Sequence, residues 1–340
     1  MKFFVLIPVY QAEKLLEPCL DSVFSQTVQD FHIILVDDGS TDGSPALCDQ
    51  AAAKDSRVTV VHQKNMGPYG ARRRAIARCL ELAEKTDWAV FLDADDSLKP
   101  NALQTIAAAA REQDCDMVFL GEDQVWDGRI LRPFPVELAH TGIVEDKRAL
   151  YKIVFQDGWY NPLWKKAVSV ALLPKEGVEA YYPVRFGEDL LQSIPMYASC
   201  RRAVFLKESL YNYAINPESA TNALRIGNYQ VSSLVLRACW DFLKSQDVWS
   251  EADFREYLGW LRRLTRFQVW IVAKFEAPIS DRCRLLGQIH DDPFYGMVIA
   301  SAPRKDVTLG LMRGGHFAAL CLLGRIMRLL GKLRRWVKKR

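Results

Sequence analysis

Hydrophobic and polar positions alternate in blocks along the first third of the chain. Short apolar runs, typical of buried strands, are separated by longer stretches whose apolar positions recur at helical spacing. The apolar runs occupy residues 3–9, 31–36, 58–61, 88–92 and 117–120, and residues 71–83 and 102–111 are examples of the helical stretches. This βαβ order predicts an α/β fold with a mostly parallel central sheet, flanked by helices and joined by right-handed crossovers.

The pattern changes further along the chain. Trp126-Asp127-Gly128-Arg129 carries an Asp-Gly hairpin signal and opens a more irregular region that runs to about residue 222. From about residue 228, apolar and basic positions recur at helical spacing, which predicts a helical appendage. The same spacing explains its aromatic residues as helix core rather than as sugar-stacking surfaces; these are Trp240, Phe242, Trp249, Phe254, Tyr257, Trp260, Phe267 and Trp270. We therefore expect a main domain at 1–222, a helical appendage at 223–315 and a tail at 316–340.

The C-terminal tail is basic and amphipathic. Residues 325–340 contain eight Lys or Arg and no acid, so without them the formal charge of the chain changes from +4 to −4. Apolar residues recur between the cations at helical spacing; they are Ile326, Leu329, Leu330, Leu333, Trp336 and Val337. Such a segment is typical of a helix that lies on an anionic membrane surface, and the apolar stretch 317–323 is too short to span a bilayer. The alternatives are a solvated tail or a helix packed on the body; nucleic-acid binding has no supporting motif.

Composition bounds the class of protein. The chain has 340 residues, of which 49% are hydrophobic and 25% charged, the balance of a folded globular protein. Its eight cysteines are scattered without a Cys-x-x-Cys pair, which predicts neither a zinc site nor a disulfide framework and suits a reducing cytosol. The five histidines show no ligand spacing, and the N-terminus leads directly into a strand, so we expect no signal peptide.

The segment 91–96, Phe-Leu-Asp-Ala-Asp-Asp, is the strongest chemical signal in the chain. Carboxylates at the end of a buried strand usually meet water, a cation or a ligand, because burying their charge is costly. If the segment stays extended, Asp93 and Asp95 lie on the same side and suit a hard divalent cation that carries substrate phosphates. The alternative is a solvated turn or a cap, with Asp96-Ser97 beginning the next helix.

A second strand, 31–36, also ends in paired acids, Asp37 and Asp38, followed by a turn rich in Gly, Ser, Thr and Asp. In open α/β sheets, ligands bind at the carboxyl ends of the strands, so both acidic pairs would face one crevice. A carboxylate there can accept a hydrogen bond from a base imide or a ribose hydroxyl, which suits a nucleotide. The alternative is a polar turn that caps a helix.

Two further segments carry candidate residues. Gly67 and Gly70 flank a helix start, and Arg72, Arg73 and Arg74 follow. Successive helical residues point about 100° apart, so only one or two of these arginines can face a diphosphate. Much later, Glu188 and Asp189 precede an apolar run. A carboxylate distant in sequence but near the site in space is a candidate general base, and the alternative for Asp189 is a helix N-cap.

Together these segments resemble family 2 glycosyltransferases, enzymes of the GT-A fold, over roughly residues 1–222. Four motifs occur in the family's order: Ile7-Pro8-Val9-Tyr10, Val36-Asp37-Asp38-Gly39-Ser40, Asp93-Ala94-Asp95-Asp96 and Gly187-Glu188-Asp189. Two later segments also resemble the family: Asn161-Pro162-Leu163-Trp164-Lys165, and Tyr211-Asn212-Tyr213 followed by Ser219-Ala220-Thr221. The chain departs from the pattern at Ala214, where the family often has a basic residue, and at Arg73, which stands in an Asn position.

The resemblance implies roles for individual residues. Asp38, helped by Asp37, would contact the base of a sugar nucleotide. Asp93 would lie near the ribose and the metal, and Asp95 would ligate a divalent cation, Mn²⁺ or Mg²⁺. Asp189 would deprotonate the acceptor hydroxyl. The remaining donor-side residues are Pro8, Tyr10, Gly67, Arg72, Arg73 and Ala94, and the acceptor-side residues are Glu188 and Trp164.

The resemblance therefore implies a metal-dependent inverting glycosyltransferase, a hexosyltransferase that uses a nucleotide sugar, most simply a UDP-sugar. Residues 1–120 would form the nucleotide-sugar half and 121–222 the acceptor half. We expect a saccharide or lipid-linked acceptor in surface polysaccharide synthesis, at the cytoplasmic face of a membrane. A nucleotidyltransferase is one alternative, but residues 8–14 after the first strand contain no glycine. An inactive sugar-binding scaffold is another alternative. The presence of both Asp95 and Asp189 argues against it.

Overall fold

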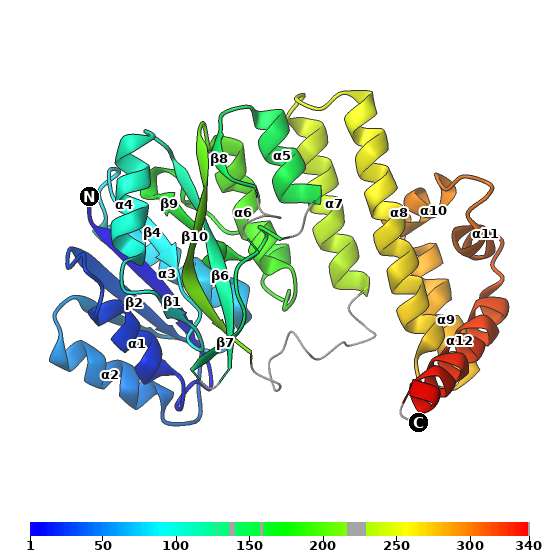
Figure 1. The fold of residues 1–340 in the computed structure, drawn as a ribbon, viewed down its shortest axis with the longest axis horizontal. Helices are drawn as coiled ribbons and strands as arrows, with labels where there is room; N and C mark the ends of the chain where they lie inside the picture. Colours follow the sequence, from blue (N-terminus) through cyan, green and yellow to red (C-terminus); the bar gives the residue numbers. More distant parts are fainter. Residues whose placement is uncertain (127, 136–139, 157–158, 216–228, 339–340) are drawn as a thin grey trace. The chain divides into compact units, whose positions relative to one another are not determined.

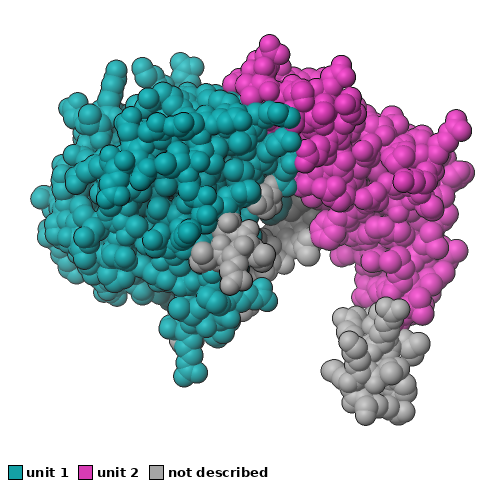
Figure 2. Space-filling model, turned by 45° about the horizontal axis from the view of Figure 1, so that its top comes forward, with its two compact units in different colours: residues 1–223 teal, residues 224–340 magenta. Residues whose placement is uncertain are grey.

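The computed structural model describes residues 1–126, 128–135, 140–156, 159–215 and 229–338. The chain divides into two compact units, residues 1–223 and 224–340 (Figure 2). All the candidate residues of the acidic motifs belong to the first unit.

The first half of unit 1 is the parallel sheet that the sequence predicts. Strands β1 (Phe3–Val9), β2 (Phe31–Asp37), β3 (Val58–His62) and β4 (Trp88–Phe91) lie in the order β3-β2-β1-β4, and each neighbouring pair is parallel (Figure 1). Helices α1 (Leu16–Phe24), α2 (Ser44–Lys54) and α3 (Gly67–Leu82) alternate with these strands in sequence. The carboxyl ends of β1 and β2 stand side by side, with Val9 opposite Asp37.

The sheet continues as a mixed sheet. Strand β9 (Lys166–Ser169) runs antiparallel between β4 and β6 (Met117–Trp126), and β6 pairs in parallel with β10 (Ala203–Ala214). Short strands β5 (Ser97–Leu98) and β8 (Gly142–Val144) pair with β10. The predicted hairpin is confirmed: β7 (Arg129–Arg132) pairs antiparallel with β6, Trp126 opposite Arg129.

Among its described residues, unit 1 also contains the helices α4 (Ala102–Glu112), α5 (Lys147–Gln156) and α6 (Glu188–Ser199). Short 3₁₀ turns lie between α5 and α6; they are η2 (Leu163–Lys165), η3 (Val170–Leu172) and η4 (Glu179–Tyr181). Turn η2 brings the Asn161–Lys165 motif next to the start of α6, because the backbone N–H of Leu163 donates to Asp189.

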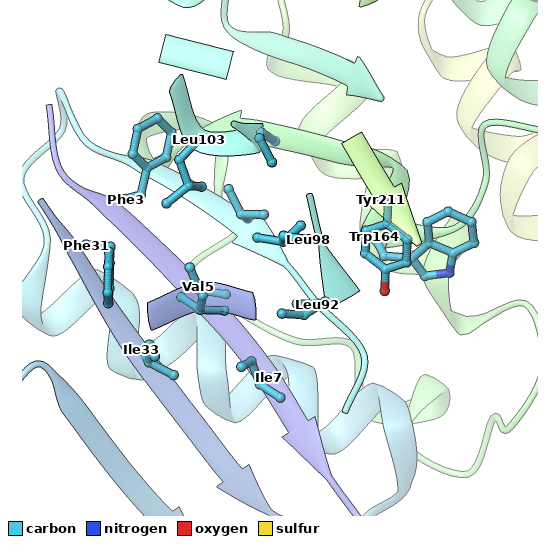
Figure 3. Packing of buried hydrophobic residues seen from close by; sticks show 14 of the residues in the cluster. Phe3, Val5, Ile7, Phe31, Ile33, Leu92, Leu98, Leu103, Trp164 and Tyr211 are labelled. Atoms are coloured by element: carbon cyan, nitrogen blue, oxygen red, sulfur yellow. The ribbon is translucent and has the colours of Figure 1, made fainter. Parts of the chain in front are cut away.

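The core of unit 1 explains the continuous apolar runs. Alternate residues of β1, among them Val5 and Ile7, pack with Ile33 of β2 and Leu92 in one buried cluster (Figure 3). Leu6, which points to the opposite face, is also fully buried. A strand buried on both faces reads as an uninterrupted hydrophobic run, and polar residues can appear only where the strand ends. The acidic motifs begin at those ends.

Unit 2 is helical, as expected. Its helices are α7 (Tyr229–Ser245), α8 (Glu251–Lys274), α9 (Ile279–Asp291), α10 (Pro293–Ala300), α11 (Val307–Arg313) and α12 (Phe317–Lys338). Trp249 and Tyr257 are buried, and the ring of Trp240 stacks on Tyr257, which supports the helix-core interpretation of these aromatics. The interpretation is wrong for Phe267, which is 61% exposed on α8 because its position points away from the buried face of that helix.

Helix α12 uses one face for packing and leaves another open. Leu320 and Cys321 are buried, and a Cβ on Gly324 would lie 2.3 Å from the carbonyl oxygen of Ala273, so α12 approaches α8 closely there. Its other face exposes six large apolar side chains: Leu322, Leu323, Ile326, Met327, Leu329 and Leu330. Across the described residues, no helix combines the length and apolar character needed to cross a bilayer.

Candidate active site

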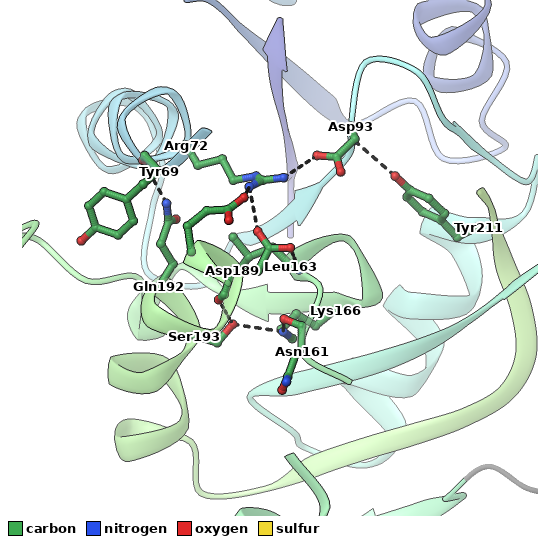
Figure 4. Close-up of polar contacts among 11 residues, drawn as sticks. Tyr69, Arg72, Asp93, Asn161, Leu163, Lys166, Asp189, Gln192, Ser193 and Tyr211 are labelled. Carbon is green, nitrogen blue, oxygen red and sulfur yellow. Dashed lines mark hydrogen bonds and ion pairs between the residues drawn. The ribbon is translucent and has the colours of Figure 1, made fainter. Parts of the chain in front are cut away.

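One arginine joins three of the predicted acids. Arg72 lies on α3 and is 6% exposed. Its Nη2 lies 2.8 Å from Oδ1 of Asp93, and its Nη1 lies 3.0 Å from Oε1 of Glu188 and 2.7 Å from Oδ1 of Asp189. Figure 4 shows the guanidinium of Arg72 between Asp93 and Asp189. Motifs 116 residues apart in sequence therefore meet in one buried cluster.

Burial and the neighbouring charges have opposite effects on the pKa values of Arg72 and Asp189. Burial disfavours the charged form of Arg72, but the three surrounding carboxylates hold its pKa well above the usual value. Burial raises the pKa of Asp189, and the nearby charge of Arg72 offsets this only in part. Burial, followed by the neighbouring charge of Asp189, raises the pKa of Glu188 to about 7. A carboxyl group whose pKa is shifted towards neutrality is suited to proton transfer.

The segment after β4 is a turn, not the extended chain expected from sequence. The backbone N–H of Asp96 donates to the carbonyl of Asp93, at 3.0 Å. The hydroxyl of Tyr211 donates to Oδ2 of Asp96 and accepts from the N–H of Asp93, at 2.7 and 3.2 Å. Asp96 also accepts from the N–H of Ala214. Asp96 therefore fixes the turn to β10, and the alternative that Asp96-Ser97 begins a helix is wrong because Ser97 begins β5.

Asp95, the predicted metal ligand, sits beside Asp93 in this turn. Its pKa is raised because burial removes the carboxylate from water and because Asp93 brings a second negative charge close to it. Two close carboxylates that raise each other's cost of ionisation suit a hard cation. Among the described residues, no cluster of three or more His, Cys, Asp or Glu could hold a metal by itself. A divalent cation would therefore take further ligands from substrate phosphates and water, as Mg²⁺ commonly does.

The acidic pair at the end of β2 braces the neighbouring loop. Oδ1 of Asp38 accepts from Gln63 Nε2 and the N–H of Met66, and Oδ2 accepts from the N–H of Gly67. Asp37 accepts similarly from Ser40 and His62. Both acids thus hold turns in place, which agrees with the polar turn of the alternative. Neither acid caps α2, which follows them, and Asp38 instead fixes the start of α3. Contact of Asp37 or Asp38 with a base stays a prediction.

The other donor-side residues gather at the same edge of the sheet. Pro8 is in β1 opposite Val36, and Tyr10 follows β1 and is 55% exposed. Ala94 is buried in the turn after β4. Gly67 has φ +76°, a conformation that favours glycine, and a Cβ there would lie 2.1 Å from the guanidinium carbon of Arg185. Sequence analysis missed Arg185, whose place beside Gly67 depends on packing between distant segments.

The structure separates Arg73 from Arg72. The guanidinium of Arg73 donates to the carbonyls of Pro174 and Lys175, at 2.8 and 3.0 Å, rather than to the acidic cluster. This follows from the rotation of about 100° between successive helical residues. The structure therefore supports Arg72, and not Arg73, as the arginine of the candidate site.

Asp189 does not cap α6. Gly187, which has φ 81°, precedes the helix, and Asp189 is the second helical residue. Its Oδ2 accepts a hydrogen bond from the N–H of Leu163, at 3.3 Å. The N-cap alternative is wrong because the left-handed glycine starts the helix earlier. Glu188 and Asp189 are both oriented by the helix, and its N-terminus favours negative charge.

Lys166 is a buried residue that sequence analysis did not identify. It is fully buried, and its Nζ donates to the carbonyl of Asn161 and to Oγ of Ser193, at 3.0 and 3.1 Å. Ser193 in turn donates to the backbone carbonyl of Asp189. Burial lowers the pKa of Lys166 to about 7. The only signal was the Lys165-Lys166 pair, and sequence cannot tell which lysine points inward; Lys165 turns instead to Glu122, at 2.9 Å.

Trp164 connects the acceptor side to β10. The indole is 8% exposed and stacks on Tyr211, with ring centroids 4.5 Å apart, and on Tyr213, at 5.5 Å. The stack holds the end of β10 beside the acidic turn. An acceptor contact by Trp164 stays a prediction, and the predicted loop 219–221 lies outside the described residues.

Comparison with known proteins finds a family that part of the chain resembles. Residues 4–164 match the family model described as glycosyl transferase family 2. The chain is 29% identical over 222 residues to the uncharacterized glycosyltransferase EpsJ of Bacillus subtilis, a match that covers 64% of this chain and 62% of EpsJ. It is 39% identical over 115 residues to glycosyltransferase GlyG of Streptococcus pneumoniae, covering 34% of this chain and 36% of GlyG. The chain therefore spans less than two thirds of the length of these curated relatives.

Solved structures show the fold of the chain. S. aureus TarS 1–349 in complex with UDP-GlcNAc matches with a TM-score of 0.69 at 20% identity, over 97% of this chain and 92% of TarS 1–349. The mannosyltransferase PcManGT of Pyrobaculum calidifontis, in complex with GDP-Man and Mn²⁺, matches with a TM-score of 0.51 at 16% identity, over 97% and 88% of the two chains. The α/β GT-A fold expected from the sequence is confirmed.

Proposed function

We propose that the chain is a metal-dependent inverting glycosyltransferase that moves a sugar from a nucleotide diphosphate donor to a hydroxyl group. The observation that carries this proposal is the meeting of Asp93, Glu188 and Asp189 on the single guanidinium of Arg72. The turn after β4 belongs to the donor side in the motif pattern, and the start of α6 to the acceptor side. Arg72 holds the two sides next to each other.

Asp189 is the proposed general base. A hydroxyl is a poor nucleophile until a carboxylate takes its proton, and such general-base catalysis is typically worth about 10²–10⁴-fold. Burial raises the pKa of Asp189, which makes its carboxylate a stronger base than an exposed aspartate. Arg72 and the N–H of Leu163 fix the carboxylate, so the base does not need to reorganise during the reaction.

Asp95 is the proposed protein ligand of a divalent cation. When bound, the cation offsets the negative charge that develops on the departing nucleoside diphosphate. The residues present fit this role, because Asp93 and Asp95 place two oxygen-donor side chains in one turn. Tyr211 and Asp96 hold that turn, so the position of Asp95 is set before any ligand arrives.

The donor is proposed to be a nucleotide sugar, with a UDP-sugar as the first candidate. Complexes of TarS with UDP and UDP-GlcNAc support this choice, while the PcManGT structure is a complex with GDP-Man. We propose a saccharide or lipid-linked acceptor in surface polysaccharide synthesis. The support is similarity to proteins such as the succinoglycan biosynthesis protein ExoW of Rhizobium meliloti, 36% identical over 117 residues that cover 34% of this chain and 36% of ExoW.

We also propose that the protein is peripheral on the cytoplasmic face of a membrane. The support is the exposed apolar face of α12 between Leu322 and Leu330, together with the cationic sequence that follows it. Apolar burial combined with basic residues is the usual basis for interfacial binding.

The proposal is tested by following the fate of the donor. The full chain is incubated with a panel of nucleotide sugars and Mn²⁺, Mg²⁺ or EDTA, with and without saccharide acceptors, and released nucleotides are identified. Release of nucleoside diphosphate that depends on metal supports glycosyl transfer. A parallel incubation replaces the nucleotide sugars with nucleoside triphosphates, and release of pyrophosphate there would show nucleotidyl transfer instead.

Two variants separate the proposed roles. Asp95→Ala should lose transfer together with metal-dependent donor binding, whereas Asp189→Asn should lose transfer but keep that binding. Asp21→Asn is the control, because Asp21 is an exposed acid on α1. Full activity of Asp95→Ala, or full wild-type activity in EDTA, would contradict the metal role. An equal loss of donor binding in Asp189→Asn would make that residue part of the donor site.

A further inference from the structure

Arg73 is a buried cation to which no described residue supplies a counter-charge. The residue is 6% exposed, and its guanidinium donates to the backbone carbonyls of Pro174 and Lys175. Burial lowers its pKa, and the groups that oppose this are the hydroxyls of Tyr69 and Tyr182 rather than a carboxylate. In the described part of the chain, then, no acid neutralises this guanidinium. Buried charges are normally paired, so the arrangement calls for a further partner.

The guanidinium lines a cavity that contains two more cations. The cavity has a volume of about 410 Å³, and its lining includes Arg73, Arg74, Lys175 and Tyr182. Gln63 and Met66 close it on the side of Asp38. Glu176 and Glu179 belong to the same segment as Lys175, but both are exposed and neither lines the cavity. Every charged side chain of the lining is therefore positive.

This cavity is separate from the Arg72 cluster. The two arginines are neighbours on α3, but Arg72 reaches Asp93, Glu188 and Asp189 while Arg73 reaches the 174–175 backbone. The cavity is bounded instead by the segment that leads to α6. That segment is tied to α3 because the hydroxyl of Tyr69 accepts from the N–H of Val178, at 3.1 Å, and Tyr182 packs edge-on against Tyr69.

We propose that the Arg73 cavity binds a phosphate group, at a site distinct from the donor site. The lining offers what a phosphate needs: a guanidinium held in a fixed orientation, two further cations and neutral hydrogen-bonding groups from Gln63 and Tyr182. The volume falls within the range of sites for small ligands and leaves room for a group attached to the phosphate.

The ligand chemistry has two sources, which the test separates. The phosphate is carried by the acceptor, as a monoester or diester of a saccharide, or it is free inorganic phosphate. In either case its binding would join α3 to the segment that leads into Gly187, Glu188 and Asp189. A phosphate bound outside the Arg72 cluster would thereby affect where Asp189, the proposed base, lies relative to α3.

The first test measures binding of inorganic phosphate without reference to activity. Arg74 and Lys175 are exposed, so the double variant Arg74→Gln/Lys175→Gln should fold normally. Phosphate binding is measured by isothermal titration calorimetry in EDTA, with excess UDP present and with chloride used to match the ionic strength. Phosphate should bind the wild type, and its affinity for the double variant should be at least tenfold weaker. The control is Lys85→Gln/Arg111→Gln, which removes the same charge from exposed positions elsewhere on unit 1.

A second variant changes the space instead of the charge. A Cβ on Gly177 would lie 3.2 Å from Nε of Arg73 and 3.1 Å from the hydroxyl of Tyr182. Gly177→Ala should therefore narrow the cavity beside Arg73 and weaken phosphate binding while UDP binding is unchanged. Equal phosphate affinity in the wild type and both variants would overturn the proposal. So would displacement of the phosphate by UDP, which would assign the cavity to the donor.

The source of the phosphate is distinguished by a transfer assay, and only this arm rests on the proposed function. If the acceptor carries the phosphate, Arg74→Gln/Lys175→Gln should raise KM for a phosphorylated saccharide at least tenfold and leave KM for its dephosphorylated form unchanged. If both KM values are unchanged while the binding test shows a site, the ligand is free phosphate. Failure of transfer altogether would contradict the proposed function and leave the binding result standing.

Discussion

Nη1 of Arg72 lies 2.7 Å from Oδ1 of Asp189, so a residue of α3 forms an ion pair with the first turn of α6. The same guanidinium reaches Asp93 with its other nitrogen. The side-chain exposures of Arg72, Asp189 and Asp93 are 7%, 20% and 26%, which gives the pairs little screening by solvent. The relative position of the proposed base and the acidic turn thus depends on one arginine.

Replacing Arg72 should therefore damage both stability and the site. Arg72→Gln leaves three close carboxylates without their cation, and removing one partner of a buried ion pair typically costs about 3–5 kcal/mol. Arg72→Lys keeps the charge but lacks the planar fork that contacts separate acids, so its free energy of unfolding should fall between those of the wild type and Arg72→Gln. Urea denaturation measures these changes.

Arg78→Gln is the matched control for Arg72. Arg78 lies on the same helix and pairs with Glu81, but the two side chains are 37% and 61% exposed. Exposed pairs of this kind contribute at most about 1 kcal/mol. Equal free energies of unfolding for Arg72→Gln and Arg78→Gln would show that the Arg72 cluster does not support the fold.

The raised pKa values of Glu188 and Asp189 predict a particular pH dependence. The proposed base must be ionised, so log kcat/KM should rise with pH and level off above the usual aspartate range. Glu188→Gln removes a neighbouring negative charge, and this rising limb should then move to lower pH. A pH–rate profile of the two proteins checks the shift; coincident profiles would contradict the coupling.

The same shift has a consequence for stability. A carboxyl group whose pKa is higher in the folded state binds its proton more tightly there, so folding is favoured at low pH and loses this contribution as pH rises. For Glu188 the window extends from the ordinary glutamate value, about 4.3, up to about 7. The stability of Glu188→Gln relative to the wild type should increase across this window. Denaturation at several pH values measures it, and a constant difference would refute the assignment.

Tyr211 should control the acidic turn. Tyr211→Phe removes the hydroxyl that bonds Asp96 and the N–H of Asp93 but keeps the ring that stacks on Trp164. Leaving buried polar groups unpaired costs about 1–3 kcal/mol. Donor binding in the presence of metal should weaken because the turn that holds Asp95 loses its brace. Unchanged donor affinity in Tyr211→Phe, measured by calorimetry, would show that the turn is held by other contacts.

The sequence predicts the strands and the acidic ends of strands well, because both follow from local pattern. Strands buried on both faces require continuous apolar runs, so polar residues can only appear at their ends, as in β2 and β4. Local pattern offered a turn at 93–96 only as an alternative and could not choose it, since the hydrogen bonds with Tyr211 that hold the turn involve a strand far along the chain. The exposure of Phe267 is a similar case, because burial depends on which helix face is covered.

Choices between adjacent residues were also beyond the sequence. Arg72 and Arg73 have the same side chain and differ only by one helical step, so the rotational position of α3 decides which one meets the acids. The same applies to Lys165 and Lys166, where the turn into β9 buries one and pairs the other with Glu122. These outcomes depend on how distant segments pack, which no local spacing encodes.

The exposed face of α12 makes the membrane proposal testable without disturbing the fold. Ile326, Leu329 and Leu330 are 45%, 56% and 54% exposed, on the side of α12 away from Leu320 and Gly324. The triple variant Ile326→Gln/Leu329→Gln/Leu330→Gln should keep its thermal stability but bind vesicles of phosphatidylglycerol and phosphatidylcholine more weakly. The loss should persist at high salt, because burial of apolar side chains is not screened.

Charge should account for the rest of the affinity. A cation near an anionic surface contributes about 1 kcal/mol to binding, and salt screens this attraction. The triple variant keeps only this charge contribution, so raising the salt concentration should reduce its vesicle binding more than that of the wild type. Val307→Gln/Ile279→Gln is the control, because these side chains are 71% and 50% exposed on other helices of unit 2. Co-sedimentation at low and high salt compares the three proteins. If the triple variant binds vesicles as well as the control does, the apolar face of α12 is not the membrane contact. If it unfolds, α12 packs on the body through this face as well.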